Sequence, residues 1–365
     1  MINVAFYVPK LIGGGAERVF VNLANELSEM SEYKVFMFVS RLGGVYEAEL
    51  KEKVELISLG DKTLFKSIMP LQSKLKLYSI SHLICGMPFP NLLGIFQKFF
   101  INKLHVTVVE HNDLRVQLLE KTGGWRKKLS PKIIKYSYGF ADEVICVSKG
   151  VQEFVNICNR KISHKVTTIY NPIFSFELIK KSNHPIDDCD FKKGKLTLIT
   201  VARLNRQKNL SLFIATCCEL KKLMPDFRAY ILGEGEEGAL LQRKILDNNL
   251  QDSVKLMGFK KNPYNYIKCS DVFLLTSKWE GFGNVLVESA ACGTPVVSIN
   301  CPSGPKEIIE NLNFGILVEQ SKPELLAKAV LECFYTDFES CAGKMAEYSI
   351  ENIAKKYTKV IFKNI

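Results

Sequence analysis

The chain has 365 residues, of which 47% are hydrophobic and 24% are charged, and its formal net charge is +11. This composition is typical of globular proteins and argues against a disordered chain, and the length predicts two domains. Eleven cysteines without a CxxC pair, and a start without the layout of a signal peptide, favour a reducing cytoplasm over a disulfide scaffold. No uncharged apolar stretch reaches about 18 residues, so we expect no membrane-spanning helix.

The first half of the chain alternates between short apolar runs and helical patterns. Residues 11–27 form a glycine-rich loop that leads into a helix with apolar residues near 3.6 spacing. Alternating strands and helices predict a parallel sheet that is covered on both faces. The strands are expected at 2–9, 33–40, 82–85, 105–112, 143–148 and 165–172.

Residues 173–195 lose this alternation and gain polar and turn residues, so we expect a linker there. The alternation starts again at residue 196, which predicts a second doubly wound domain. Its strands are expected at 196–204, 227–233, 254–259, 271–277 and 295–300, and its helices at 209–222, 236–248, 263–268 and 284–292.

The positive charge is concentrated in residues 60–140, which hold 13 Lys and Arg but only 4 Asp and Glu. Apolar residues are interleaved with this charge, as in LLGIFQKFF (92–100) and WRKKLSPKIIK (125–135). The window is either a solvated face beside a core or a surface for anionic lipid head groups. A nucleic-acid surface is a third reading, but no nucleic-acid motif accompanies the charge.

The stretch SKWEGFGNVLVESAACGTPVV (277–297) places Glu280 and Glu288 on either side of a glycine turn. We expect Glu280 in a loop, the helix to start at Gly283–Asn284, and Glu288 in the second helical turn. Free N–H groups and a partial positive charge make such a helix start suitable for a phosphate. The two acids would then flank a phosphate site.

Two basic residues, Arg203 and Lys208, follow the first strand of the second half. Open α/β sheets bind ligands at the carboxyl ends of their strands, and each cation could add a charge-assisted hydrogen bond there. The competing interpretation is a solvated loop.

Five segments resemble the retaining glycosyltransferases of family 4: GGGAERV, VARLNRQKN, LGEGEE, GFKKN and EGFGNVLVE. The resemblance covers nearly the whole chain. The segments GGGAERV and CPSGPKEII (301–309) are most similar to enzymes of bacterial surface-polysaccharide and glycan assembly. It implies the GT-B fold, with two Rossmann-like domains facing across a cleft. Residues 1–172 would bind the acceptor and 196–345 the nucleotide sugar, while 346–365 would form a C-terminal helix that returns toward the first domain.

The resemblance also implies roles for individual residues. Arg203 and Lys208 would hold the diphosphate, Glu288 the ribose hydroxyls and Glu280 the hydroxyls of the transferred sugar. His111 would lie near the reactive centre, although a histidine at a strand end is often only structural. Glu280 and Glu288 could instead be a dipole partner and a surface acid. Further donor contacts are expected from Gly14, Gly15, Gly235, Phe282, Gly283, Asn284 and Val285.

The sequence GEGEEG (233–238) matches a dinucleotide-binding pattern, but its glutamates would repel a pyrophosphate, so we interpret it as a wall of the nucleotide pocket. No metal-ligand spacing is visible, and Asp188 and Asp190 lie in the expected linker. We therefore expect no cofactor, no metal and no nucleic acid.

The resemblance implies a sugar nucleotide as donor, by expectation a UDP-sugar, and retention by front-face attack, in which the departing phosphate takes the acceptor proton. The acceptor would be a saccharide or a polyprenyl-linked saccharide, and the protein would be cytoplasmic and peripheral on an anionic inner-membrane surface. Two alternatives stay open: a sugar-nucleotide epimerase of the same fold, and a non-catalytic sugar-nucleotide or lipid-binding protein.

Overall fold

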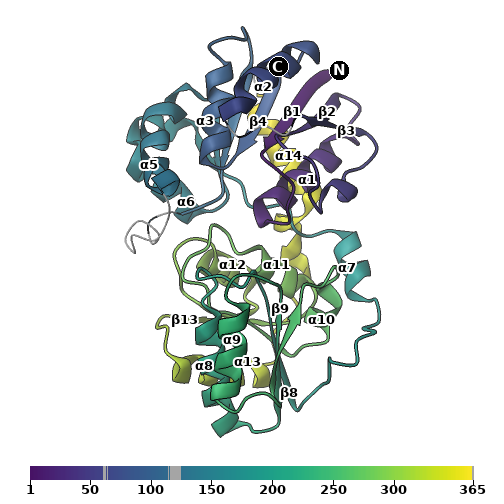
Figure 1. Ribbon diagram of the computed structural model, residues 1–365, viewed down its shortest axis with the longest axis vertical. Helices are drawn as coiled ribbons and strands as arrows, with labels where there is room; N and C mark the ends of the chain where they lie inside the picture. The colour runs from purple at the N-terminus through teal and green to yellow at the C-terminus, as the bar shows by residue number, and fades with distance from the viewer. Residues whose placement is uncertain (61–62, 64, 114, 116–124, 364–365) are drawn as a thin grey trace. The chain divides into compact units, whose positions relative to one another are not determined.

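The computed structural model describes residues 1–60, 63, 65–113, 115 and 125–363. The chain forms two compact units (Figure 1). Unit 1 contains residues 1–173 together with 347–365, and unit 2 contains residues 174–346. Each unit is an α/β structure built on its own sheet, as the alternating sequence pattern predicts.

The sheet of unit 1 has seven parallel strands in the order β3-β2-β1-β4-β5-β6-β7. Its inner strands are almost fully buried because helices cover both faces, which explains their continuous apolar sequences. The strands are β1 (Ile2–Val8), β2 (Tyr33–Val39), β3 (Val54–Ser58), β4 (His82–Gly86), β5 (His105–Glu110), β6 (Glu143–Cys146) and β7 (Val166–Thr168).

Unit 1 is built from two segments of the chain, residues 1–173 and 347–365, and both contribute helices. The last helix, α14, buries Ile353, Ala354 and Tyr357 and packs against α1, and the side chain of Ser349 caps its first turn. The α-helices are α1 (Gly15–Leu27), α2 (Ile68–Leu77), α3 (Pro88–Gln97), α5 (Trp125–Ser137), α6 (Lys149–Cys158) and α14 (Ile350–Ile361). Short 3-10 helices are η1 (Glu47–Glu49), η2 (Phe65–Ser67), η3 (Tyr138–Phe140) and η4 (Arg160–Lys165).

The sheet of unit 2 has six parallel strands in the order β10-β9-β8-β11-β12-β13. These strands are β8 (Leu196–Val201), β9 (Phe227–Leu232), β10 (Val254–Gly258), β11 (Val272–Leu275), β12 (Val296–Ile299) and β13 (Gly315–Val318). The helices are α7 (Phe176–Ser182), α8 (Leu210–Leu223), α9 (Gly238–Asp247), α10 (Tyr264–Lys268), α11 (Asn284–Ala291), α12 (Pro305–Leu312) and α13 (Pro323–Tyr335), followed by the 3-10 helix η5 (Ala342–Tyr348). The core lies between the sheet and α8, α9 and α13.

Three features differ from the sequence expectation. The strands β3 and β13 were not predicted, and each of these short edge strands has only one buried residue. The expected linker, 173–195, contains α7 and belongs to unit 2 from residue 174 onward. Ser175 caps α7 by accepting the Leu178 N–H, a local signal that the polar composition of the segment concealed.

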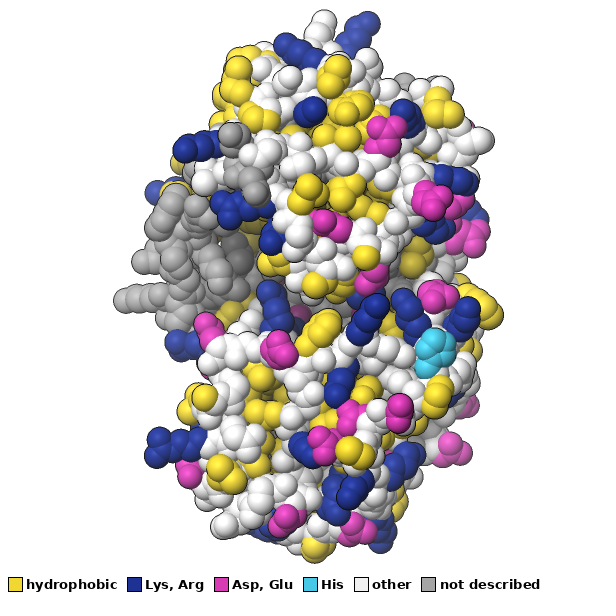
Figure 2. Space-filling view, turned by 45° about the vertical axis from the view of Figure 1, so that its right-hand side comes forward, with side chains coloured by type: hydrophobic (Ala, Val, Ile, Leu, Met, Phe, Trp, Pro, Cys, Tyr) yellow, Lys and Arg dark blue, Asp and Glu magenta, His cyan; other side chains and the backbone are white. Residues whose placement is uncertain are grey.

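The surface carries mixed charge on the face shown in Figure 2, where basic and acidic side chains alternate with apolar patches. No helix within the described ranges combines the length and the apolar character needed to cross a bilayer.

Candidate active site

The sheet order of unit 2 changes direction between the neighbouring strands β8 and β11, because the chain first builds outward through β9 and β10 and then returns to the other side of β8. In open parallel sheets, ligands bind at the carboxyl ends of the strands at such a switch point. Arg203 follows β8, Glu280 follows β11, and Gly304 follows β12. The candidate residues of the second half therefore gather at the edge of the sheet where a ligand is expected.

An ion pair joins two of these segments: Lys208 Nζ lies 2.6 Å from Glu280 Oε1. Both side chains are largely removed from water, with exposed fractions of 16% and 8%. The backbone supports the pair, because the Lys278 N–H donates to Gln207 O over 2.9 Å and Gln207 Nε2 donates to Trp279 O over 3.0 Å. The structure thus fixes the cation expected to hold a phosphate beside the acid expected to hold a sugar.

Helix α11 begins without a side-chain cap, with Gly283 at its N-cap position in the left-handed region at φ = 95°. The loop after β12 crosses closely here, since a Cβ on Gly304 would lie 1.9 Å from Phe282 O. Gly304 is in turn the N-cap of α12, and no side chain caps that helix either. Two helix N-termini with their partial positive charge therefore meet at the carboxyl edge, an arrangement suited to an anion.

Glu288 lies in the second turn of α11, as the sequence pattern predicts. Its exposed fraction is 8%. Asn284 and Val285 in the first turn are half-buried. Phe282 is 2% exposed. Its role as a donor contact stays a prediction.

The loop with the glutamates, residues 233–238, packs on the residue that follows Arg203. Leu204 N–H donates to Glu234 O, and Leu204 O accepts from the Glu237 N–H. A Cβ on Gly235 would lie 2.3 Å from Leu204 O, so this close approach requires glycine. Arg203 itself is exposed. Its side chain is therefore accessible to a ligand at the edge of the sheet.

In unit 1 the corresponding switch point lies between β1 and β4. Gly13, with φ = 104°, and Gly14 follow β1, and Gly14 is the N-cap of α1 without a side-chain cap. A Cβ on Gly14 would lie 2.0 Å from Glu17 Oε2, so the carboxylate of Glu17 folds back to the start of its own helix. A side chain at position 14 would therefore require the flexible end of Glu17 to move.

His111 follows β5 and is 7% exposed, with its ring in edge contact with Phe20 at a centroid distance of 5.5 Å. Its Nε2 atom has no hydrogen-bond partner among the described residues. Burial lowers the pKa of His111 to about 4, so the imidazole is neutral at physiological pH. A neutral ring with a free nitrogen can form one hydrogen bond to a ligand without adding a charge.

Glu110, which the sequence analysis did not single out, holds the loop that carries His111. Its carboxylate is fully buried and accepts from Tyr138 Oη over 2.7 Å and from the Asn112 N–H over 3.3 Å. Asn91 donates to Tyr138 Oη over 2.8 Å and extends the network. Burial raises the pKa of Glu110 to about 7. The signal was an acid at the end of the otherwise apolar run HVTVVE.

Within the described residues, no three His, Cys, Asp or Glu side chains are grouped closely enough to hold a metal ion. Asp188 and Asp190 pair instead with lysines: Lys260 Nζ lies 2.6 Å from Asp188 Oδ2, and Lys255 Nζ lies 2.5 Å from Asp190 Oδ1. Tyr266 also donates to Asp188. These acids fasten the segment before β8 to the rest of unit 2.

Comparisons with known proteins agree with this architecture. The family described as glycosyltransferase family 4 matches residues 13–174, and the family described as glycosyl transferases group 1 matches residues 186–355. HepE from Anabaena, solved in complex with UDP and glucose, has a TM-score of 0.80 at 17% identity, and the match covers 100% of both chains. That likeness shows the fold, which is the predicted GT-B type with two Rossmann-like parallel sheets.

Two curated relatives are similar over part of their length. One is an uncharacterized glycosyltransferase of Methanocaldococcus jannaschii, 30% identical over 191 residues that make up 51% of this chain and 47% of that protein. The other is the N-acetylgalactosamine-N,N'-diacetylbacillosaminyl-diphospho-undecaprenol 4-alpha-N-acetylgalactosaminyltransferase of Campylobacter jejuni, 32% identical over 231 residues, which are 63% of this chain and 60% of that protein. The chain thus spans about half to three fifths of these relatives.

The chain belongs to the group 1 and family 4 glycosyltransferases, with one family match in each half of the sequence. Of the residues predicted for the site, unit 2 contains Arg203, Lys208, Gly235 and the motif from Glu280 to Glu288, and it joins Lys208 to Glu280 directly. Unit 1 contains Gly14, Gly15 and His111.

Proposed function

We propose that the protein transfers a sugar, with retention of its anomeric configuration, from a UDP-sugar to a saccharide acceptor in bacterial glycan assembly. One observation carries the proposal: the start of α11 at Gly283 lies at the switch point of unit 2, with the Lys208–Glu280 pair on one side and Glu288 in the second turn. These groups match the parts of a nucleotide sugar. The cation and the helix N-terminus suit its phosphates, and the two acids suit the hydroxyls of its sugar and of its ribose.

In this proposal the diphosphate is bound by the N–H groups at the start of α11 and by Arg203 and Lys208. Their charges stabilise the negative charge that develops on the leaving phosphate, the usual source of catalysis for such a group. Glu280 accepts hydrogen bonds from hydroxyls of the transferred sugar, while Glu288 accepts them from the ribose. Lys208 keeps two further donors beyond Glu280 for the phosphate.

The reaction itself breaks the bond between the sugar carbon and the diphosphate oxygen, and the acceptor hydroxyl attacks from the same face. The departing phosphate takes the proton of that hydroxyl. The neutral imidazole of His111 serves as a hydrogen-bond partner near the reactive carbon, and the proposal includes no bound metal, since basic residues and helix N-termini neutralise the phosphates.

The proposed acceptor is a saccharide linked to a polyprenyl diphosphate. The Campylobacter relative is named for an acceptor on diphospho-undecaprenol, which supports this class. The enzyme would then work in the cytoplasm, peripheral on the anionic inner face of the membrane. The excess of Lys and Arg between residues 60 and 140 supports the membrane contact. In that window the side chains of Arg126, Lys127 and Lys128 lie outside the described residues.

The experiment is a screen of UDP release with a panel of UDP-sugars, each with and without a mixture of saccharide acceptors. Acceptor-dependent release with one donor, and a product whose anomeric configuration by NMR equals that of the donor, are expected. Turnover of the donor to an isomeric UDP-sugar without acceptor would identify an epimerase instead. Binding of UDP without release from any donor would identify a non-catalytic binding protein.

A further inference from the structure

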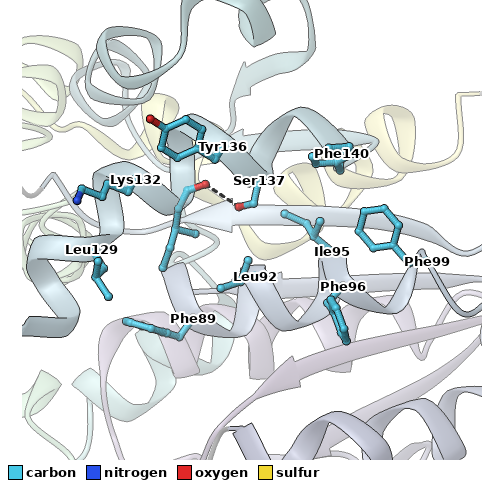
Figure 3. A pocket seen from close by; sticks show the side chains of 11 residues that line it. Phe89, Leu92, Ile95, Phe96, Phe99, Leu129, Lys132, Tyr136, Ser137 and Phe140 are labelled. Carbon is cyan, nitrogen blue, oxygen red and sulfur yellow. Dashed lines mark hydrogen bonds between the residues drawn. The ribbon is translucent and has the colours of Figure 1, made fainter.

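A groove of about 410 Å³ lies between helices α3 and α5 of unit 1 (Figure 3). Both helices and the turn that follows α5 supply apolar side chains to it. In Figure 3, Phe89 and Leu129 lie toward one end, and Phe99 and Phe140 toward the other. Six of the lining residues are Phe89, Leu92, Ile95, Leu129, Ile133 and Phe140.

The groove presents apolar side chains to a ligand and almost no polar groups. Ser137, one of its three polar lining residues, donates its hydroxyl to Ile133 O over 2.6 Å. The other two, Lys132 and Tyr136, are exposed, and their polar ends point away from the groove in Figure 3. A peptide in this groove would bury backbone groups without partners, which is unfavourable, whereas a hydrocarbon chain would bury none.

The aromatic rim is held in place rather than loose. Phe99 and Phe140 are 63% and 55% exposed, and their rings touch at a centroid distance of 5.6 Å. On one side of Phe140, Tyr138 is buried and bonded to Glu110. Lys165 Nζ donates to the carbonyl oxygens of the residues before and after Phe140, Gly139 O and Ala141 O, over 2.6 Å each. A fixed apolar surface of this kind marks an interaction site.

The charge around the groove is positive. Asp142 is neutralised by Lys98 at 2.5 Å. Lys132 and Lys135 have no ion pair with a carboxylate of the described residues, and Lys135 Nζ lies 5.4 Å from the centre of the Tyr136 ring. Cations of this kind near an anionic leaflet contribute about 1 kcal/mol each to membrane binding. The surroundings of the groove therefore suit phosphates, while its interior suits hydrocarbon.

We propose that the α3–α5 groove binds one isoprenoid chain of the polyprenyl-diphosphate-linked acceptor. This rests on the proposed function, and it adds a binding site for the lipid part of the acceptor in unit 1. The chain lies along the side chains of α3 and α5, with Phe99 and Phe140 at one end, and Lys132 and Lys135 face the phosphates of the membrane surface.

The test uses a polyprenyl-diphosphate-linked saccharide that carries a diazirine in its isoprenoid chain, in vesicles of phosphatidylcholine and phosphatidylglycerol. Photolysis followed by mass spectrometry should place the label in peptides covering residues 89–99 and 129–140. Leu129→Trp fills the groove and should lower the labelling about tenfold, as expected when the contacts of two methylene groups are lost. Leu325→Trp, on an exposed position of α13 in unit 2, is the matched control and should label like wild type.

A second pair of variants tests the site without filling it. Tyr136 and Tyr335 are both 68% exposed and both lie on helices, α5 and α13. Tyr136→Asp should lower the labelling because it places a negative charge at the rim, while Tyr335→Asp should not. Thermal unfolding of all four variants identifies any that fail to fold. The Trp pair and the Asp pair test binding in the groove independently of each other.

Three results would overturn the proposal. The label could appear in other peptides, or both Leu129→Trp and Tyr136→Asp could be labelled like wild type. A phospholipid with the diazirine in its acyl chain could also label the same peptides equally. UDP release with a water-soluble acceptor analogue is measured beside it and should be unchanged in Leu129→Trp. Absence of release from the wild type would refute the proposed function, and it would be seen separately from the labelling result.

Discussion

Lys208 and Glu280, 72 residues apart in sequence, form an ion pair of 2.6 Å in which neither side chain is more than 16% exposed. Taking two charges out of water is costly, and the loss of one partner leaves the other buried without compensation. The pair therefore couples the residue assigned to the diphosphate with the residue assigned to the sugar. A substitution at either position will also change the electrostatics of the other.

We expect this coupling in a double-mutant cycle. Lys208→Ala should lower kcat/KM about 10²-fold, because it removes a charge at the leaving group. Glu280→Ala should lower turnover, while the affinity for UDP does not fall, because it frees Lys208 for the phosphate. The double variant should lose about 0.5–3 kcal/mol less than the sum of the single losses. Strict additivity in kcat/KM would show that the two residues act independently.

Arg203 and Arg206 allow a comparison within one loop. Both are exposed between β8 and α8, but only Arg203 directly follows the strand at the switch point. Arg203→Ala should reduce kcat/KM about 10²-fold, since it removes a charge-assisted bond to the leaving phosphate. Arg206→Ala is the control and should stay within a few fold of wild type. Activity of Arg203→Ala within threefold of wild type would refute its assignment.

Glu288 should act mainly on binding. The ribose contact exists both before and during the reaction, so Glu288→Ala should weaken UDP binding without a matching loss of kcat. Titration calorimetry should show a rise in Kd of about tenfold or more, which corresponds to about 1.4 kcal/mol. Glu310→Ala, an exposed acid on α12 that pairs with Lys306, provides the control. Equal effects of Glu288→Ala and Glu280→Ala on UDP affinity would contradict the separate roles.

The sequence predicted most elements of the fold because buried parallel strands are continuous apolar runs and helices have a different period. Every strand proposed from such a run is present, whereas β3 and β13, at the edges of the two sheets, were missed. Within the expected linker, 173–195, the helix α7 was missed because so short a helix gives a weak periodic signal. The assignment of Glu280 to a loop and Glu288 to the second turn of a helix matches the structure.

The residues of the candidate site come from the sequence and stay predictions, whereas the contacts among them come from the structure. Residue type and position after a strand pointed to Arg203, Lys208 and Glu280. Nothing in the spacing indicated that Lys208 would bind Glu280, since the loops after β8 and β11 meet only through the sheet order. The network of Glu110 depends likewise on Tyr138, which reaches it from a turn after α5.

The buried Glu110 predicts an unusual pH dependence of stability. Its pKa is raised from 4.5 to about 7 in the fold, so between these values the folded chain keeps a proton that the unfolded chain has lost. This contribution destabilises the protein as pH rises from 4.5 to 7. Glu110→Gln should therefore become more stable relative to wild type by up to about 3 kcal/mol over that range. Urea unfolding of both proteins at pH 5 and pH 7.5 measures the difference.

The buried His111 changes the stability of the fold with pH in the direction opposite to Glu110. The two contributions can be measured separately. Its pKa is lowered from 6.5 to about 4, so the unfolded chain binds the extra proton and its contribution destabilises the fold as pH falls from 6.5 to 4. The comparison of Glu110→Gln with wild type cancels this contribution, because His111 is present in both. A difference between the two proteins that does not change with pH would mean that Glu110 titrates normally.

We further predict that transfer continues in excess EDTA. In the proposed mechanism, the charge of the diphosphate is neutralised by Arg203, Lys208 and the starts of α11 and α12. A chelator therefore removes nothing that the reaction requires. UDP release should be the same with EDTA as without it. Loss of activity in EDTA that magnesium or manganese restores would place a metal ion in the reaction.

The position of α14 in unit 1 has a consequence for biosynthesis. Unit 2, residues 174–346, is complete before the ribosome has made the helix that covers α1, so unit 1 exists for a time with the apolar residues of α1 uncovered. We expect this exposed apolar surface to favour aggregation of the nascent first half, although that half is synthesised first. A nonsense mutation near codon 346 would remove α14, and we expect it to destabilise unit 1, although most of unit 1 is encoded at the other end of the gene.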